Sequence, residues 1–206
     1  MNIINVRHIV SSAILVLLAA CGSTPQSNYY LLSAPGNAEQ NSQTPSLGIG
    51  PIEIPEYLNR NGLVYHRDGN KLDIASYERW AEPLASGVER VIGLNLATLL
   101  GTQNIQSYPW HRNDAPEYGV QVTIIMLDTT ATTATLVAEW VVQKPQQNTL
   151  LTRKITQLHM ALPAGDVQPS QIPATYSDLL FQLSEVIAAS ITADQASSTE
   201  PATSAP

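Results

Sequence analysis

Short stretches of alternating apolar and polar residues predict β-strands, because successive side chains of a strand point to opposite faces. The clearest stretch runs from Tyr118 to Asp128, with Val120, Val122 and Ile124 on one face. The same period, or a short apolar run, predicts further strands at residues 29–32, 47–54, 63–67, 72–75, 105–110, 134–142 and 150–162.

Two turn signals predict hairpins between neighbouring strands. Asp68-Gly69-Asn70 separates two strand-like runs, and an Asp-Gly pair in that position is typical of a tight β-turn. The Thr-rich segment 129–133 joins the strand at 118–128 to its expected partner at 134–142. Strands joined by such short turns should be antiparallel.

Two amphipathic helices are predicted from apolar residues at helical spacing. The apolar stripe of the first includes Trp80, Leu84 and Val88, so this helix should start between residues 76 and 82. Pro83 then belongs in its first turn, where the missing N–H costs nothing, and Gly101 is expected as its C-cap.

The second helix carries its apolar stripe from Tyr176 to Ile191. Thr175, with Asp178 three residues later, is a capping signal for its start. Runs of strands followed by a helix, twice over, predict an α+β fold. We expect a mostly antiparallel sheet with two long amphipathic helices packed on one face.

The N-terminus has the pattern of a secretory signal peptide. Arg7 lies in a short basic region, and residues 9–20 are apolar apart from Ser11 and Ser12. A helix that spans a bilayer needs roughly 20 apolar residues, so this run is too short for an ordinary transmembrane anchor. A buried core helix is the alternative, which the position behind a basic residue at the extreme N-terminus disfavours.

Leu18-Ala19-Ala20-Cys21 resembles the lipobox of bacterial lipoproteins, in which the cysteine thiol takes a diacylglycerol through a thioether bond. Cys21, the only cysteine of the chain, is therefore the expected lipid attachment site. Several acyl chains on one residue would anchor the protein permanently. Gly22 stands where lipoproteins retained at the inner membrane carry Asp, which favours the outer membrane, with the protein facing the periplasm.

The sequence thus predicts four segments. They are a lipoprotein signal peptide at 1–20, a lipidated tether at 21–28, a single α+β domain at 29–192 and a disordered tail at 193–206. The tail is assigned from its Ala, Ser, Thr, Pro and acidic composition.

Charge and cysteine content exclude several classes of protein. The chain has 10 Lys and Arg against 17 Asp and Glu, with no basic surplus to neutralise phosphates, so nucleic-acid binding is not expected. One cysteine excludes an intramolecular disulfide and a Cys-rich zinc site. Removal of Arg7 with the signal peptide leaves 9 basic and 17 acidic residues, a net charge of −8. The lipid, rather than surface charge, must then attach the protein to an anionic bilayer.

Recognisable catalytic and metal-binding motifs are missing from the sequence. His66, His111 and His159 lie in separate predicted elements, without the spacing of metal ligands. There is no Gly-x-Ser-x-Gly elbow and no phosphate-binding glycine loop. Acidic pairs are close in sequence, unlike the separated carboxylates of a glycosidase. We therefore expect no enzyme activity, no metal and no other cofactor.

Tyr77, Trp80, Trp110 and Trp140 are candidate aromatic residues for recognition of a partner. Core packing is the alternative for each of them. For Trp80 and Trp140 it is favoured, because Trp80 lies on an apolar stripe and Trp140 lies in the middle of a strand.

A set of short motifs, in the expected order, resembles the PqiC (YmbA) family of lipoproteins. The motifs are Tyr29-Tyr30-Leu31-Leu32, Tyr57-Leu58-Asn59-Arg60, Arg79-Trp80-Ala81-Glu82-Pro83-Leu84 and Leu136-Val137-Ala138-Glu139-Trp140. The chain departs from the family pattern at Asn61-Gly62, where Pro-Gln is common, and in its acidic tail.

This resemblance implies a non-enzymatic auxiliary component of an ABC-type, MCE-type system for intermembrane phospholipid transport, which supports membrane integrity. The implied partners are a periplasmic MCE-domain protein with its inner-membrane component, and the outer membrane through the lipid anchor. MCE assemblies are ring-like, so a ring-forming homo-oligomer would match them.

Tyr57, Leu58, Asn59 and Arg60 are the candidate docking residues for such a partner or for a second subunit. They follow an edge strand and combine an aromatic side chain with an Arg, both of which are enriched at interface hot spots. In the alternative, Tyr57 and Leu58 fold back on the core while Arg60 pairs with a nearby acid.

Two other functions remain open from the sequence. One is an outer-membrane lipoprotein that scaffolds a barrel or lipopolysaccharide assembly machine, which shares the anchor and needs no catalytic residue. The other is a small periplasmic hydrolase or ligand-binding lipoprotein, which a bound molecule in a closed apolar pocket would favour.

Overall fold

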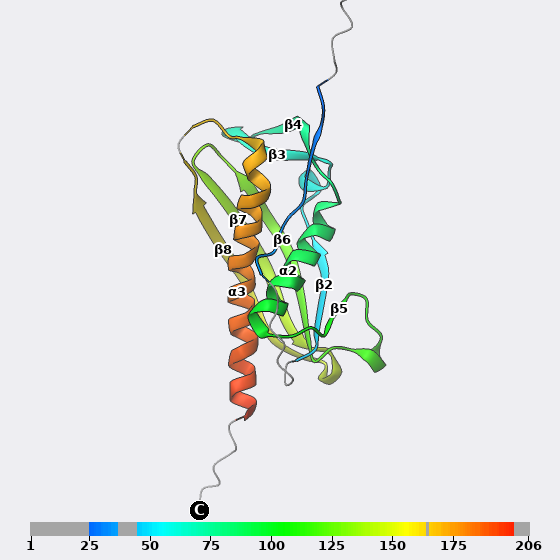
Figure 1. Cartoon of the computed structure of the whole chain (residues 1–206). Helices are drawn as coiled ribbons and strands as arrows, with labels where there is room; N and C mark the ends of the chain where they lie inside the picture. Colours follow the sequence, from blue (N-terminus) through cyan, green and yellow to red (C-terminus); the bar gives the residue numbers. More distant parts are fainter. Residues whose placement is uncertain (1–24, 37–44, 164, 200–206) are drawn as a thin grey trace, which may run out of the picture.

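The computed structural model describes residues 25–36, 45–163 and 165–199 (Figure 1). The predicted signal peptide at 1–20, the attachment site Cys21 and residues 200–206 of the predicted tail lie outside the described residues. Within them, the chain forms a three-stranded and a five-stranded sheet with two long helices, an α+β fold as predicted.

The strands of the described chain are β1 (Asn28–Tyr30), β2 (Leu47–Glu53), β3 (Gly62–Asp68), β4 (Lys71–Trp80), β5 (Ile105–Ser107), β6 (Tyr118–Thr129), β7 (Thr133–Lys144) and β8 (Thr149–Ala161). The helices are α2 (Leu84–Leu100) and α3 (Ile172–Thr199), with short 3-10 turns η1 (Glu56–Leu58), η2 (Arg112–Asp114), η3 (Pro145–Gln147) and η4 (Pro169–Gln171).

Both sheets are mixed, so the prediction of a mostly antiparallel sheet is wrong. The larger sheet has the order β5-β2-β6-β7-β8, and β2 is parallel to both of its neighbours. The smaller sheet has the order β1-β4-β3, with β1 parallel to β4. The hairpins β3–β4, β6–β7 and β7–β8 are antiparallel. A short turn determines the relative direction only of the two strands that it joins, whereas β1 and β2 pair with strands distant in sequence.

A long connection separates the parallel strands β2 and β5. The chain leaves β2 through η1, forms the β3–β4 hairpin and returns along α2 before it enters β5. Figure 1 shows the smaller sheet at one end of the molecule, where the described chain begins, and the end of α3 at the opposite end. The β3–β4 hairpin also contacts η4, immediately before α3.

The first helix starts later than the sequence predicts. Trp80 ends β4 instead of lying on the stripe of α2, and the helix begins at Leu84 with Pro83 as its N-cap. The residue before a proline is biased toward extended backbone, which keeps the segment ahead of Pro83 out of the helix. The predicted C-cap is confirmed, because Gly101 is left-handed with a φ of 67°.

The predicted core positions of both tryptophans are confirmed. Trp80 is 7% exposed and stacks on Tyr176 of α3, with ring centroids 6.3 Å apart. Trp140 is 1% exposed, and its indole N–H donates to the Thr156 hydroxyl at 2.8 Å.

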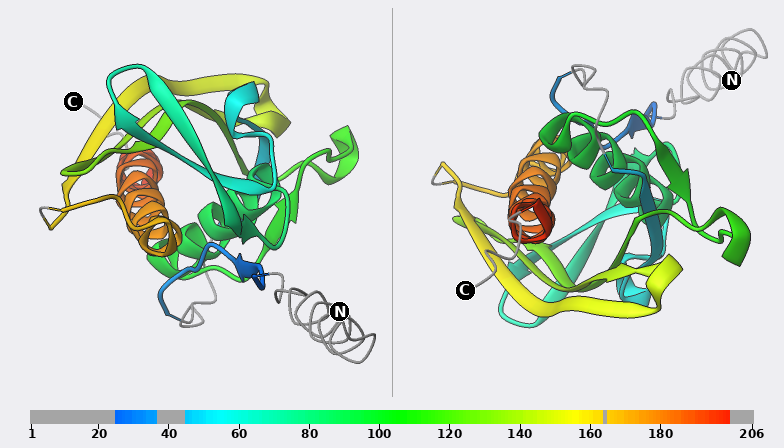
Figure 2. Two further views of the ribbon diagram at one scale, coloured as in Figure 1. Left: turned by 90° about the horizontal axis from the view of Figure 1, so that it is seen from above. Right: turned by 90° about the horizontal axis from the view of Figure 1, so that it is seen from below.

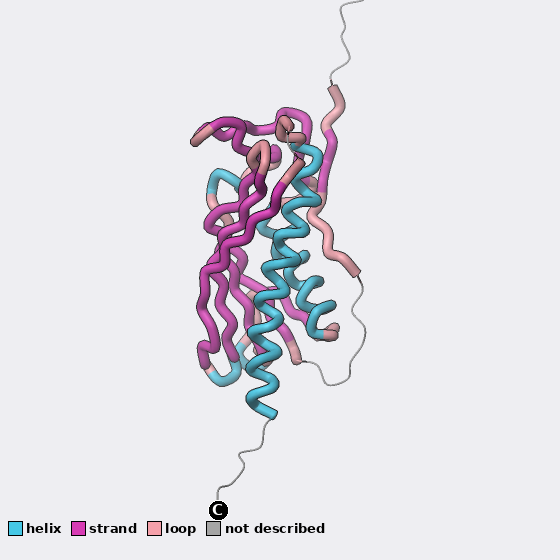
Figure 3. Tube along the Cα trace, turned by 90° about the vertical axis from the view of Figure 1, so that its left-hand side faces the viewer, coloured by secondary structure: helices cyan, strands magenta, loops and turns pink. Residues whose placement is uncertain are grey.

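The helices α2 and α3 lie side by side and contact strands of the larger sheet (Figures 2 and 3). The apolar stripe of α3 supplies fully buried side chains to this interface: Leu179, Leu180, Leu183, Ile187 and Ile191.

Both ends of α3 differ from the sequence-based prediction. The helix begins at Ile172, and the Thr175 hydroxyl donates to the Gln171 carbonyl instead of capping the start. It runs past residue 192 to Thr199, through the first part of the segment predicted to be disordered. Asp194 fixes the helix just past residue 192, because it accepts a hydrogen bond from the Tyr118 hydroxyl at 2.7 Å and pairs with Lys144 at 2.5 Å.

Trp110 is held against the larger sheet by two glycines that face each other on adjacent strands. Gly48 of β2 and Gly119 of β6 are register partners. A Cβ atom on Gly48 would lie 2.6 Å from the Trp110 ring and 2.5 Å from Pro116, and one on Gly119 would lie 3.2 Å from the same ring. Because neither glycine carries a side chain, the indole of Trp110 packs closely on the backbone of β2 and β6.

We expect Gly48→Ala to lower the free energy of unfolding by about 1–3 kcal/mol, because the added methyl group overpacks this contact. Urea denaturation measures the change. The matched control is Gly93→Ala in α2, where a Cβ would lie an ordinary 3.6 Å from Ile49. That control should be neutral or stabilising by up to ~1 kcal/mol. Equal stabilities of Gly48→Ala and the wild type would contradict the close approach of Trp110.

The hydrogen bond and the ion pair of Asp194 should make the free energy of unfolding depend on pH. Burial alone would raise the pKa of Asp194, but hydrogen bonds from Lys144 and Tyr118 and the charge of Lys144 outweigh it and lower the pKa below its ordinary value. A lowered folded-state pKa stabilises the protein above the unfolded-state pKa, and this contribution is lost as pH falls through the folded-state value.

Wild type should therefore exceed Asp194→Asn in unfolding free energy at pH 7, and the difference should shrink when both are measured in urea at pH 3. Tyr118 and Lys144 remain in both proteins, so the comparison isolates the carboxylate. A difference that stays constant between the two pH values would show that the Asp194 charge does not hold the end of α3.

Candidate docking site

The predicted docking residues form a tight corner between β2 and β3, which we call the docking corner (residues 57–60). Pro55 precedes the corner in extended conformation and accepts a hydrogen bond from the Leu58 N–H at 2.9 Å. The Asn59 N–H donates to Glu56 at 3.1 Å, and the Arg60 N–H donates to Leu58 at 2.8 Å. Successive backbone hydrogen bonds thus fix its shape.

Two side chains of the docking corner point inward. Leu58 is 2% exposed in the hydrophobic core, and Tyr57 is half-buried against it. Burial raises the pKa of the Tyr57 phenol, a backbone hydrogen bond with Leu127 acts in the opposite direction, and the nearby Asp128 charge raises it further. Tyr57 and Leu58 therefore anchor the corner and offer a partner little surface.

The other two side chains point outward. Asn59 and Arg60 are both exposed. Among the described residues no ion pair engages Arg60, although ion pairs engage Arg67, Arg90, Lys144 and Arg153. The core-packing alternative therefore fits the first half of the corner, and its expected Arg60–acid pair is not present in the described chain.

A group of polar side chains behind the corner joins it to β6 and α3. The Tyr176 hydroxyl of α3 donates to the Leu127 carbonyl at 3.2 Å, and His66 Nδ1 lies 2.5 Å from the Asp128 carboxylate. Full burial raises the pKa of Tyr176 far above its ordinary value, so its phenol stays neutral. Strands and a helix from three parts of the chain thus support the corner from behind.

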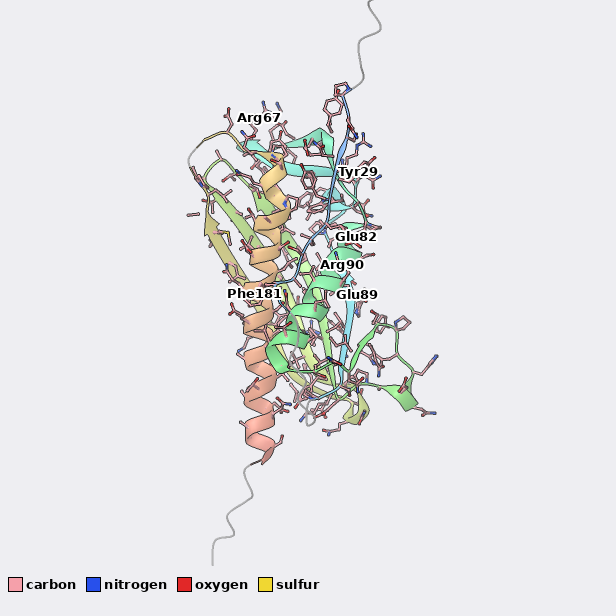
Figure 4. The ribbon with its side chains drawn as sticks, in the orientation of Figure 1. Tyr29, Arg67, Glu82, Glu89, Arg90 and Phe181 are labelled. Carbon is pink, nitrogen blue, oxygen red and sulfur yellow. The ribbon has the colours of Figure 1, made fainter. Side chains whose placement is uncertain are left out.

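A mostly apolar groove of about 390 Å³ lies between α2 and the β2–β5 edge of the larger sheet. Its lining includes Ile49, Gly93, Leu94, Ala97, Thr102 and Ile105. Near the start of α2, the Arg90 guanidinium donates to Glu82 at 2.6 Å and to the Leu32 carbonyl at 3.0 Å (Figure 4). Sequence reasoning missed this groove because its lining comes from elements that only the long connection brings together.

The described parts of the chain contain no group of three or more His, Cys, Asp or Glu side chains placed to hold a metal ion. No helix in those parts is long and apolar enough to cross a membrane. The docking corner itself is a turn fixed by backbone hydrogen bonds that leaves Asn59 and Arg60 exposed.

Residues 29–188 match the family described as the ABC-type transport auxiliary lipoprotein component. The match covers both sheets, both helices up to residue 188 and the docking corner. It defines the class of protein as an auxiliary component of a transport system. The chain belongs to this family of lipoproteins, and the resemblance predicted from its motifs is confirmed.

The curated relatives are intermembrane transport lipoproteins. The chain is 31% identical over 96 residues to PqiC of Escherichia coli K12 and, to the same extent, to PqiC of Shigella flexneri. The alignment covers 45% of this chain and 51% of each relative. The chain therefore spans about half the length of the curated relatives it matches.

Solved structures share the fold at low sequence identity. A crystal structure of a Xanthomonas campestris protein has a TM-score of 0.64 at 12% identity and covers 84% of this chain and 100% of its own. A crystal structure of an uncharacterized protein has a TM-score of 0.61 at 19% identity, with coverage of 81% and 99%. These likenesses extend to the fold alone.

The division of the docking corner predicts a large loss of stability for one alanine substitution and almost none for another. Leu58→Ala should lower the free energy of unfolding by about 2–5 kcal/mol, because it leaves a cavity in the core. Arg60→Ala should change it by no more than about 0.5 kcal/mol, because the side chain is exposed and unpaired. Urea denaturation of both variants tests this, and a large loss in Arg60→Ala would make Arg60 a structural residue instead.

Proposed function

We propose that the protein is a non-enzymatic component of an MCE-type system that transports phospholipid between membranes. In this proposal it is anchored through Cys21 in the outer membrane, faces the periplasm, and receives the periplasmic MCE assembly together with the inner-membrane component of that system. The observation that carries the proposal is the family match over residues 29–188, joined to the lipobox-like Leu18–Cys21. The similarity to PqiC, an intermembrane transport lipoprotein, supports transport between membranes, and phospholipid as the cargo is what the motif resemblance implies.

The docking corner is the surface we assign to the partner. Its inward half is fixed by Leu58 and Tyr57, so the outward half is presented without further ordering. A partner that buries Arg60 gains a planar cation able to form paired hydrogen bonds with a carboxylate. Because hydrogen bonds already fix the backbone of the corner, binding orders mainly the side chains of Asn59 and Arg60.

The same surface is available for contact between copies of this chain. A ring of subunits would match a ring-like MCE assembly, so we include homo-oligomerisation in the proposal. Loss of such a system would weaken the barrier of the outer membrane, and a deletion strain should become sensitive to detergent.

Co-purification of the intact lipoprotein from detergent-solubilised membranes, with partners identified by mass spectrometry, tests the proposed function. We expect an MCE-domain protein among the partners. Arg60→Ala should weaken its binding by about tenfold or more if Arg60 behaves as an interface hot spot. The matched control is Lys154→Ala on β8, which also removes one exposed cation and should bind as the wild type does.

Recovery of barrel or lipopolysaccharide assembly proteins in place of an MCE-domain protein would overturn the transport proposal and support a scaffold. Recovery of the MCE-domain protein with equal yields for Arg60→Ala and the wild type would retain the transport role and reject the docking corner.

A further inference from the structure

One face of the smaller sheet exposes tyrosine and leucine side chains beside an arginine. Tyr29 of β1 and Arg79 of β4 are register partners on parallel strands, so their side chains share a face. Tyr77 lies two residues before Arg79 on β4, in an irregular stretch of that strand, and is exposed beside this pair. Tyr29 is 66% exposed and Tyr77 is 44% exposed, and Leu31, just beyond the end of β1, is 54% exposed. We call these four residues the N-terminal face.

Where β1 pairs with β4, the opposite face turns toward the core. Trp80 packs into the hydrophobic core, and its register partner Tyr30 packs against it. The sheet therefore has a core face and an outer face, and the outer face carries large apolar side chains where polar residues are expected.

The composition of the N-terminal face is that of a membrane–water interface. Tyrosine places an apolar ring next to lipid and keeps its hydroxyl in water, which is why it is enriched at the headgroup level. Arginine keeps its charged end among phosphates while its stem covers apolar surface.

The position of this face limits what can cover it. Figure 4 shows Tyr29 at the end of the molecule where the described chain begins. Seven peptide units separate Cys21 from Asn28, a span of at most about 25 Å when fully extended. A lipid on Cys21 would thus hold the N-terminal face within that distance of the bilayer.

Charge favours the same arrangement. The strands of the smaller sheet contain three basic residues, Arg67, Lys71 and Arg79, and three acidic residues, Asp68, Asp73 and Glu78. Their net charge is zero, so the −8 of the mature chain lies entirely outside this sheet. An anionic bilayer repels the acidic remainder and leaves the neutral sheet as the part of the protein that can approach it.

We propose that the N-terminal face lies on the surface of the bilayer that holds the lipid anchor, with Tyr29 and Tyr77 at the headgroup level and Arg79 beside lipid phosphates. This inference rests on the proposed lipid anchor at Cys21. The anchor supplies the attachment and the face supplies the orientation, so that the far end of α3 points away from the membrane.

Tryptophan fluorescence in vesicles tests the orientation. The lipidated protein carrying Tyr77→Trp is reconstituted into vesicles of phosphatidylethanolamine and phosphatidylglycerol, with and without lipids brominated near the headgroup end of the acyl chain. The wild-type signal of Trp80, Trp110 and Trp140 is subtracted. We expect the added fluorescence of Trp at position 77 to be lost in brominated vesicles.

The matched control is Leu150→Trp. Leu150 is 58% exposed and lies at the start of β8. The β6–β7 turn, which lies near η4, is at the other end of the larger sheet. Its added fluorescence should be the same with and without bromine. If Tyr77→Trp does not fold by circular dichroism, Tyr29→Trp on the same face replaces it.

Flotation of the vesicles with wild type and with Cys21→Ser reports the anchor separately. If the wild type floats but the fluorescence of Trp at position 77 is not quenched, the proposed orientation is overturned and the proposed anchor is retained. Shielding of position 77 from an aqueous quencher only after a protein partner is added would also overturn it, since the face would then be a protein interface. Equal flotation of wild type and Cys21→Ser would instead reject the anchor itself.

Discussion

The parallel pairing of β2 with both of its neighbours is the constraint on which the rest of the structure depends. Parallel strands cannot be joined by a tight turn, so the chain must leave β2 at one end of the sheet and return before it enters β5. The docking corner, the β3–β4 hairpin and α2 together make that return path. The corner and the smaller sheet therefore lie at the same end of the molecule, and α2 descends beside β2, where the apolar groove forms.

The sequence pattern predicted correctly those features that residues close together in the chain determine. The hairpins with short turns are antiparallel as expected, and Gly101 ends its helix as expected. The parallel pairs could not be predicted because their partners are far apart in sequence. Trp80 was misplaced for a related reason: its spacing from Leu84 fits a helix, yet Pro83 stands between them, and the same tryptophan fits the buried face of a strand.

The docking corner shows the same division within a single motif. Its four residues were predicted to act as one surface, but β6 and α3 decide which of them stay accessible. Tyr57 and Leu58 are covered because Leu127 and the core lie behind them, whereas Asn59 and Arg60 stay exposed. Asp194 is a parallel case: the composition of its segment indicates disorder, and only the folded positions of Tyr118 and Lys144 make it an ordered end of a helix.

The length of α3 has a practical consequence for experiments on living cells. Its 28 residues extend about 42 Å from the end of the molecule near the smaller sheet to the opposite end. A reporter inserted directly after Thr199 would therefore lie about 42 Å from the start of α3.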